Sequence, residues 1–318
     1  MSFHILGTGS YVPPTVLTND DLAQIVDTND EWISARTGIR RRHVAADETT
    51  SEMAAKAAAA ALENSGAEPE ELDLILCATV SGDYICPNMA CLVQRAIGAS
   101  CPAFDLNGAC SAFLLLLETA AAYLSTGRYR KILCVGAEQM SRILDWTDRS
   151  TCILFGDGAA GVVLEPGDNY LGSELIFRGS QELLNLPTAV GTFPGSRLEP
   201  QHPYVYMNGS EIYKFATRIV PQVIQQLLDK TGTAQTDVKW VICHQANRRI
   251  IEAAARRLKD IPAEKFLMNI EDYGNTSAAS IPLLLDECNR AGKFQKGDLI
   301  VFAAFGGGLS CVASLVRW

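Results

Sequence analysis

The sequence lacks an excess of positive charge, and none of its cysteines is paired at metal-binding spacing. Its 27 Lys and Arg are outnumbered by 36 Asp and Glu, which leaves a net charge of -9. A general nucleic-acid binder needs a positive field toward the phosphates, so the composition predicts no nucleic-acid partner. No Cys-x-x-Cys pair occurs among the ten cysteines, and we expect no metal site.

A basic, apolar leader is also missing, because the first residues pass from a few apolar side chains to glycine and proline. This start favours a cytoplasmic protein. Residues 299–316 form an uncharged run that is long enough to span a membrane. However, Gly306, Gly307 and Gly308 lie within it and would penalise a helix by roughly 3 kcal/mol relative to alanine. Two buried strands joined by a glycine turn are therefore predicted, with no membrane contact.

Cysteine is plentiful, and 48% of all side chains are apolar. Cys77, Cys134 and Cys243 lie inside apolar runs that are typical of buried strands. In a chain of 318 residues such cysteines behave as small hydrophobic side chains, so we expect them to be reduced and buried.

Short strand patterns alternate with helical ones along the chain, which is typical of an α/β protein. In the first part, the patterns predict helices over 53–62 and 112–124 and strands over 73–80, 131–135 and 159–164. In the second part, they predict helices over 211–228 and 248–258 and strands over 238–243, 299–304 and 311–316.

The two parts have similar spacing. Cys77 and Cys243 each end a predicted strand and are 166 residues apart, while Ile132 and Leu299 each begin one and are 167 apart. These offsets predict an internal duplication, with one half over 1–167 and the other over 168–318, although chance spacing in an α/β protein is an alternative. The Gly-Asp turn at 167–168 marks the predicted boundary.

One cysteine lies where chemistry is expected. Cys110, in the segment Asn-Gly-Ala-Cys-Ser-Ala-Phe, comes where a turn of small residues meets an apolar helix. Unpaired N–H groups and the helix dipole favour a thiolate there, so we expect a lowered pKa and a nucleophile. The alternative is that Cys110 fills the core, as the other nine cysteines are expected to do.

Only His244, among four histidines, directly follows a predicted buried strand and precedes a helix. Functional side chains often lie at such strand ends, although a core or capping histidine is the alternative. Asn275 lies in a Gly-Asn-Thr-Ser turn, where a helix cap is the simpler interpretation. The order Cys, His, Asn also occurs in papain-like proteases, but neither the flanking residues nor the predicted sheet pattern fits that class.

Five motifs together point to a known family. The segments GACSAF, HQAN, GNTSAAS, FGGGLS and DEWISARTGIRRR resemble those of β-ketoacyl-acyl-carrier-protein synthase III, in the family's order and at its spacing. The resemblance implies a thiolase-like fold of two duplicated βαβαβαββ halves in five αβαβα layers. It also implies a homodimer, and a 1–167 half that carries the cysteine while the 168–318 half carries the histidine and asparagine.

The resemblance further implies a two-stage reaction without a cofactor, since acyl-CoA is a substrate. Cys110 would accept an acyl group from acyl-CoA, and malonyl-acyl-carrier protein would then lose CO2 and attack that thioester to give a 3-ketoacyl carrier protein, initiating fatty acid synthesis. His244 and Asn275 would each donate a hydrogen bond to the enolate oxygen. The amides of Cys110 and Gly307 would form the oxyanion hole, because a side chain at Gly307 would crowd the acyl oxygen.

The remaining implied roles concern binding. The positions that match CoA contacts in the family are Thr28, Trp32, Arg36, Arg149, Gly209, Tyr213 and Asn247. Those expected to dock the acidic carrier protein are Lys214, Arg249, Arg256 and Arg257. Cys86-Pro87 stands where acetyl-selective relatives often carry Phe-Pro, which suggests room for longer primers. A condensing enzyme of secondary metabolism, a cysteine thioester hydrolase and a non-catalytic carrier-binding protein are the alternatives.

Overall fold

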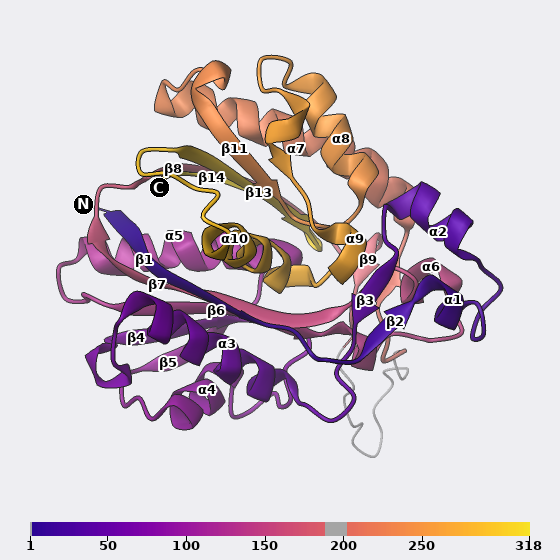
Figure 1. The fold of residues 1–318 in the computed structure, drawn as a ribbon, viewed down its shortest axis with the longest axis horizontal. Helices are drawn as coiled ribbons and strands as arrows, with labels where there is room; N and C mark the ends of the chain where they lie inside the picture. The colour runs from indigo at the N-terminus through magenta and orange to yellow at the C-terminus, as the bar shows by residue number, and fades with distance from the viewer. Residues whose placement is uncertain (1, 188–201) are drawn as a thin grey trace.

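The computed structural model describes residues 2–187 and 202–318, which form two five-stranded sheets with helices between and outside them (Figure 1). The order of strands in the first sheet is β1-β7-β6-β4-β5, and the bounds are Ser2–Tyr11, Asp157–Gly167, Ile132–Gln139, Leu74–Ala78 and Ala103–Leu106, respectively. β1, β7 and β6 pair antiparallel, whereas β6, β4 and β5 pair parallel.

The second sheet repeats this arrangement. Its order, read from the corresponding end, is β8-β14-β13-β11-β12, and the bounds are Tyr170–Ser180, Gly308–Arg317, Leu299–Gly306, Val238–Cys243 and Phe266–Leu267, respectively. The first two pairings are antiparallel and the last two parallel, as in the first sheet. Equal strand order and equal pairing sense support the predicted duplication. β7 ends at Gly167 and β8 begins at Tyr170, while the division of the chain at 167 stays a prediction.

Helices complete five layers (Figure 1). α3 (Thr50–Ser65) and α4 (Met89–Ile97) cover the outer face of the first sheet, and α7 (Gly209–Thr231) and α8 (Arg248–Arg257) cover the outer face of the second. α5 (Ala112–Ser125) and α10 (Ser280–Arg290) lie between the two sheets. The smaller elements are β2 (Val16–Thr18), α1 (Asn19–Leu22), α2 (Asp30–Thr37), β3 (Arg41–His43), α6 (Arg149–Cys152), β9 (Leu184–Asn185), β10 (Tyr206–Met207) and α9 (Ile270–Tyr273).

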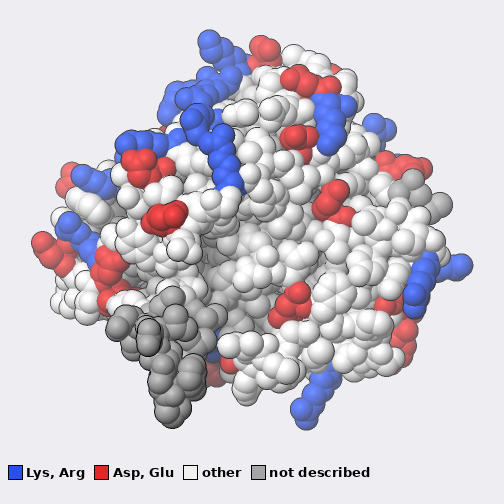
Figure 2. Space-filling model, turned by 180° about the vertical axis from the view of Figure 1, so that it is seen from behind, with Lys and Arg blue, Asp and Glu red and all other residues white. Residues whose placement is uncertain are grey.

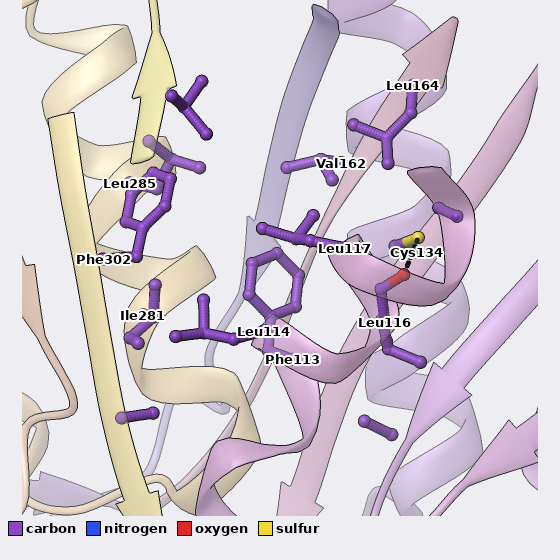
Figure 3. Close-up of a cluster of buried hydrophobic side chains, with 14 of the residues drawn as sticks. Phe113, Leu114, Leu116, Leu117, Cys134, Val162, Leu164, Ile281, Leu285 and Phe302 are labelled. Carbon is purple, nitrogen blue, oxygen red and sulfur yellow. Dashed lines mark hydrogen bonds between the residues drawn. The ribbon is translucent and has the colours of Figure 1, made fainter. Parts of the chain in front are cut away.

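The middle layer explains why α5 is apolar on most faces. In Figure 3, Leu114 of α5 points toward Ile281 of α10, while Leu117 lies beside Val162 of the first sheet. Leu114 and Leu117 are both fully buried. A helix that contacts a sheet or another helix on every side has no surface left for polar residues, and burying each leucine contributes about 2 kcal/mol. The packing holds the N-terminus of α5 rigidly at the centre of the molecule.

The structure confirms the helices and strands predicted from the sequence, with ends that differ by a few residues. The uncharged run over 299–316 is the β13–β14 hairpin, with Gly307 at its turn, as predicted. Within residues 2–187 and 202–318, no helix has the length and apolarity needed to cross a membrane.

Candidate active site

The same backbone turn occurs at the start of both central helices. The short 3-10 turn Ala109–Ser111 precedes α5, and Ser277–Ala279, 168 residues later, precedes α10. Ala109 and Ser277 both have positive φ, at 48° and 49°. In each turn an asparagine side chain accepts the N–H two residues on, from Ala109 to Asn107 at 3.2 Å and from Ser277 to Asn275 at 2.9 Å. Cys110 and Asn275 thus lie on equivalent turns, one from each half of the duplicated fold.

Cys110 lies at the N-terminus of α5, as predicted, but its electrostatics differ from the prediction. Burial raises the pKa of the Cys110 thiol to about 11, and nearby Glu138 adds to the rise. The expected lowering by the helix N-terminus is therefore wrong for the resting site, because desolvation of a thiolate outweighs the favourable dipole. The hydroxyl of Ser277 lies beside the thiol and partly offsets this rise in pKa.

His244 directly follows β11 and is 2% exposed. Its Nδ1 is 2.7 Å from the hydroxyl of Ser280, the first residue of α10, and its ring meets Phe305 edge-on at 5.4 Å. Burial lowers the pKa of His244 to about 3, so the imidazole is neutral at physiological pH. Ser280 also accepts a 3.4 Å bond from the N–H of Gln245. A hydrogen bond donated by the Ser280 hydroxyl to Nδ1 would place the histidine proton on Nε2.

Asn275 is held by the first half of the chain. Its N–H donates to the carbonyl of Leu154 at 2.9 Å, and its carbonyl accepts from the N–H of Gly156 at 3.1 Å. Because Asn275 Oδ1 already accepts the N–H of Ser277, the Nδ2 amide is the part of the side chain that remains to donate. Asn275 is 6% exposed, so a donor here works in a largely dry environment.

The two glycines near the nucleophile differ in how closely they approach its backbone. Gly306 ends β13, and a Cβ added there would lie only 2.9 Å from the backbone N of Cys110. A Cβ on Gly307 would meet nothing closer than Leu184, at 3.5 Å. The close approach to the Cys110 backbone therefore occurs at Gly306, which is not a turn residue. The predicted hydrogen bond from the Gly307 amide stays a prediction.

These groups share one cavity of about 1180 Å³, which lies between the two halves. Cys110, His244, Asn275, Gly307 and Phe305 line it. Five of the predicted CoA contacts also line it: Trp32, Arg36, Gly209, Tyr213 and Asn247. The cavity thus joins a charged, aromatic entrance to the half-buried thiol of Cys110.

Other predicted residues lie outside the cavity wall. Arg149 lies over the Trp32 ring with its Cζ 4.8 Å from the ring centroid, and Arg36 lies over the same ring at 4.4 Å. Thr28 and the exposed pair Cys86-Pro87 do not line the cavity. The hydroxyl of Thr28 is buried without a hydrogen-bond partner in the described structure.

Lys and Arg gather over α7 and α8, at the top of the molecule in Figure 2. Arg249 lines the cavity and lies over the ring of Tyr213 at 5.3 Å. Lys214 pairs with Glu211 at 2.7 Å and Arg256 with Glu252 at 3.9 Å, whereas Arg249 and Arg257 have no ion-pair partner among the described residues. The predicted docking residues therefore form one exposed patch beside the cavity, with Arg249 at its border.

Sequence reasoning missed three polar residues that support the site: Glu138, Ser277 and Ser280. Glu138 is fully buried near the end of β6, where it accepts hydrogen bonds from several neighbours including Ser277. A charged residue inside an apolar strand was the available signal, and the repeat of Asn107 at Asn275 was another. Among residues 2–187 and 202–318, no group of three His, Cys, Asp or Glu side chains is arranged to hold a metal ion.

Comparison with known proteins identifies the class. A family model described as 3-oxoacyl-[acyl-carrier-protein] synthase III matches residues 104–179, and one for the C-terminal part of the same enzyme matches residues 228–318. A β-ketoacyl-[acyl-carrier-protein] synthase III from Desulfitobacterium hafniense is 48% identical over 100% of this chain and 98% of its own length. One from Clostridium acetobutylicum is 44% identical over 100% of this chain and 99% of its own.

A crystal structure of the corresponding enzyme from Aquifex aeolicus superposes with a TM-score of 0.93 at 44% identity, covering 99% of this chain and 100% of that one. The fold is thus thiolase-like, and the protein is an acyltransferase of the condensing class. The chain belongs to the β-ketoacyl-acyl-carrier-protein synthase III family.

Proposed function

We propose that Cys110 takes an acyl group from acyl-CoA and that malonyl-acyl-carrier protein then condenses with it to give a 3-ketoacyl carrier protein, the first condensation of fatty acid synthesis. The observation that carries this proposal is the meeting of Cys110, His244 and Asn275 in one cavity with an aromatic and cationic entrance. Family membership at 48% identity supports the reaction class.

In the first stage the sulfur of Cys110 attacks the thioester carbonyl, and the carbonyl oxygen becomes an oxyanion. A side chain at Gly306 would lie 2.9 Å from the backbone N of Cys110, so this glycine leaves room beside the amide that we propose as the first donor. Gly307 is proposed as the second donor. Preorganised amides are effective here because they need no reorganisation when charge develops.

In the second stage decarboxylation of the malonyl group generates the carbanion directly, so no strong base is required. What is required is stabilisation of the enolate oxygen. A neutral His244 with its proton on Nε2, and the Nδ2 amide of Asn275, are both suited to donate to that oxygen. The scheme uses protein donors and two substrates, and we propose that it needs no cofactor or metal.

The two stages can be separated by mutation. His244→Ala and Asn275→Ala should impair malonyl decarboxylation by about 10²-fold or more while Cys110 acylation remains measurable. Transfer of labelled acyl groups and release of CO2 would be followed separately, with Cys110→Ala as the control that blocks both. Release of free acid without malonyl-carrier protein, as fast as condensation with it, would instead favour a thioester hydrolase.

The entrance suits acyl-CoA. Trp32 provides an aromatic face for a nucleobase, and the guanidinium of Arg36 can pair with phosphates. Arg149 must swing off the Trp32 ring to admit the adenine. Gly209, Tyr213 and Asn247 are proposed along the pantetheine path, with Thr28 near its outer end.

A second copy of the chain is proposed to complete the site. β5 is the last strand of its sheet, so its outer edge is unpaired in the described structure. Nearby, Tyr84 and Ile85 are 63% and 85% exposed, which is unusual for large apolar side chains. We propose that this edge and loop form a homodimer interface and bring Cys86 toward the partner's primer pocket.

Cys86 is proposed to close the end of the partner's primer pocket and so to determine which acyl-CoA primers fit. Cys86→Phe should reduce the rate with butyryl-CoA or isobutyryl-CoA more than with acetyl-CoA, because a larger side chain shortens the pocket. Competing primers with malonyl-carrier protein would be scored by product mass. Equal changes for all primers would remove Cys86 from the pocket.

A further inference from the structure

Glu138 is a buried carboxyl group with no cation beside it. It is fully buried, and no lysine or arginine lies within ion-pair distance in the described part of the chain. Its charge is instead compensated by hydrogen bonds from N–H and O–H donors. Such a group is costly to keep ionised, since water is excluded and no opposite charge is present. Desolvation indeed raises its pKa.

The two oxygens of Glu138 have different environments. Oε2 accepts from the N–H groups of Val80 and Ser81 at 3.0 and 3.1 Å, and from the hydroxyls of Ser81 and Thr79 at 2.5 and 3.2 Å. Among the described residues, Oε1 accepts only from the hydroxyl of Ser277, at 3.0 Å. Oε2 is therefore saturated with donors, whereas Oε1 has room for a proton that arrives through Ser277.

Ser277 joins this carboxyl group to the nucleophile. Its hydroxyl donates to Glu138 Oε1 at 3.0 Å and lies beside the thiol of Cys110. With the Ser277 proton directed to Glu138, the Ser277 oxygen is left to accept the proton of the Cys110 thiol. Ser277 is held there at a φ of 49°, a conformation that costs a serine about 1–3 kcal/mol and persists only where its surroundings require it.

The duplication relates Glu138 to a residue that lies beside His244. Gly136 of β6 pairs with the last residue of β4, and Ala303 of β13 pairs with the last residue of β11, the equivalent strand of the second sheet. Gly136 and Ala303 are 167 residues apart. Glu138 therefore corresponds to Phe305, which contacts His244. In the first half of the chain, the Glu138 carboxyl group therefore occupies the position that Phe305, the neighbour of His244, occupies in the second half.

We propose that Glu138 is the base for the nucleophile, taking the thiol proton of Cys110 through Ser277 and storing it until the condensation step. The inference rests on the function proposed above. It supplies the acceptor that a thiol with a raised pKa requires.

The proton and bond changes balance over the cycle. In acylation the Cys110 proton moves to Ser277 Oγ while the Ser277 proton moves to Glu138 Oε1, and the thiolate forms an S–C bond to the acyl carbon. The bond from that carbon to the CoA sulfur breaks, and the CoA thiolate takes a proton from solvent. In condensation the carbanion forms the C–C bond and expels the Cys110 thiolate, which recovers the stored proton by the reverse path.

The test measures how the rate of Cys110 alkylation by iodoacetamide depends on pH, with the full-length protein and without acyl-CoA. When the proton moves from the Cys110 thiol to the Glu138 carboxylate, the protein as a whole neither gains nor loses a proton. The fraction of thiolate formed in this way is therefore independent of pH. The wild-type rate should therefore have a plateau around neutral pH. Glu138→Gln should lose the plateau, so that the rate rises tenfold per pH unit and is about 10²-fold lower at pH 7. Alkylation would be located at Cys110 by peptide mass.

Three variants make the test specific. Ser277→Ala should reproduce the Glu138→Gln profile, and the double variant should be no slower, because both changes break one path. Ser81→Ala removes a donor from Oε2 only and should keep the plateau. A wild-type plateau and rate in both Glu138→Gln and Ser277→Ala would overturn the proposal, as would a uniform reduction at every pH, which indicates a structural role. A protein that shows the plateau but accepts no acyl group would refute only the proposed function.

Discussion

Substitution by alanine should strongly reduce the rate of acylation at Gly306 and have little effect on it at the adjacent Gly307. Gly306→Ala would place a Cβ 2.9 Å from the backbone N of Cys110 and 3.2 Å from that of Ser111. Neither backbone atom can move easily, because both belong to the turn that starts the buried helix α5. The methyl group would therefore displace or cover the Cys110 amide that we assign to the oxyanion.

The expected loss follows from the removal of one preorganised donor. It amounts to about 3 kcal/mol of transition-state stabilisation, or about 10²-fold in the rate of acylation. The protein should also lose about 1–3 kcal/mol of unfolding free energy from overpacking. Gly307→Ala is the matched control, since its methyl group would meet Leu184 and Ala109 at ordinary contact distances and its own N–H is retained. Its acylation rate should change by about twofold or less.

Single-turnover transfer from labelled acyl-CoA, read by quenched-flow, measures the acylation step alone. Thermal unfolding of each variant at the same pH separates folding from catalysis. The reasoning would be refuted if Gly307→Ala lost as much acylation as Gly306→Ala. It would also fail if Gly306→Ala were folded and acylated at the wild-type rate.

Other substitutions test the supporting groups. Ser280→Ala should slow malonyl decarboxylation by about tenfold without affecting Cys110 acylation, because the His244 tautomer is no longer fixed. Ser280→Thr keeps the hydroxyl and should restore the decarboxylation rate. Equal loss of decarboxylation in both variants would contradict this role. Arg249→Glu should raise the KM for malonyl-carrier protein by about tenfold. Arg128→Glu makes the same charge change just beyond the C-terminal end of α5 and should leave this KM unchanged. An unchanged KM for Arg249→Glu would remove the docking role. Protonation of His244 favours the unfolded chain below its ordinary pKa of 6.5, since the folded value is about 3. The unfolding free energy should therefore fall by about 1 kcal/mol more in the wild type than in His244→Gln between pH 7 and pH 5.5, and equal pH dependence in chemical denaturation would contradict burial of the neutral ring.

Periodicity and strand-end position carried much of the information in the sequence. The α/β class, the strands that precede His244 and the glycine hairpin over 299–316 follow from local patterns, because burial of one face imposes a period on the residues. Cys110 was placed correctly at a helix start for the same reason. These features depend on residues close together in the chain.

What the sequence did not reveal depends on contacts between distant segments. The pKa of Cys110 was predicted in the wrong direction because its desolvation comes from both halves of the chain. The roles of Gly306 and Ser277 were missed because each faces a residue more than a hundred positions away, Cys110 in one case and Glu138 in the other. The cytoplasmic location, the homodimer and the choice of primer stay predictions.

The central claim is that an acyl group passes through Cys110, and intact-protein mass spectrometry tests it most directly. Incubation with acyl-CoA alone should add one acyl mass, located by peptide mapping on the segment that contains Cys110. Addition of malonyl-carrier protein should then remove that mass and yield one equivalent of 3-ketoacyl-carrier protein. An acyl mass on another cysteine, or one that remains in place while product forms, would contradict the account.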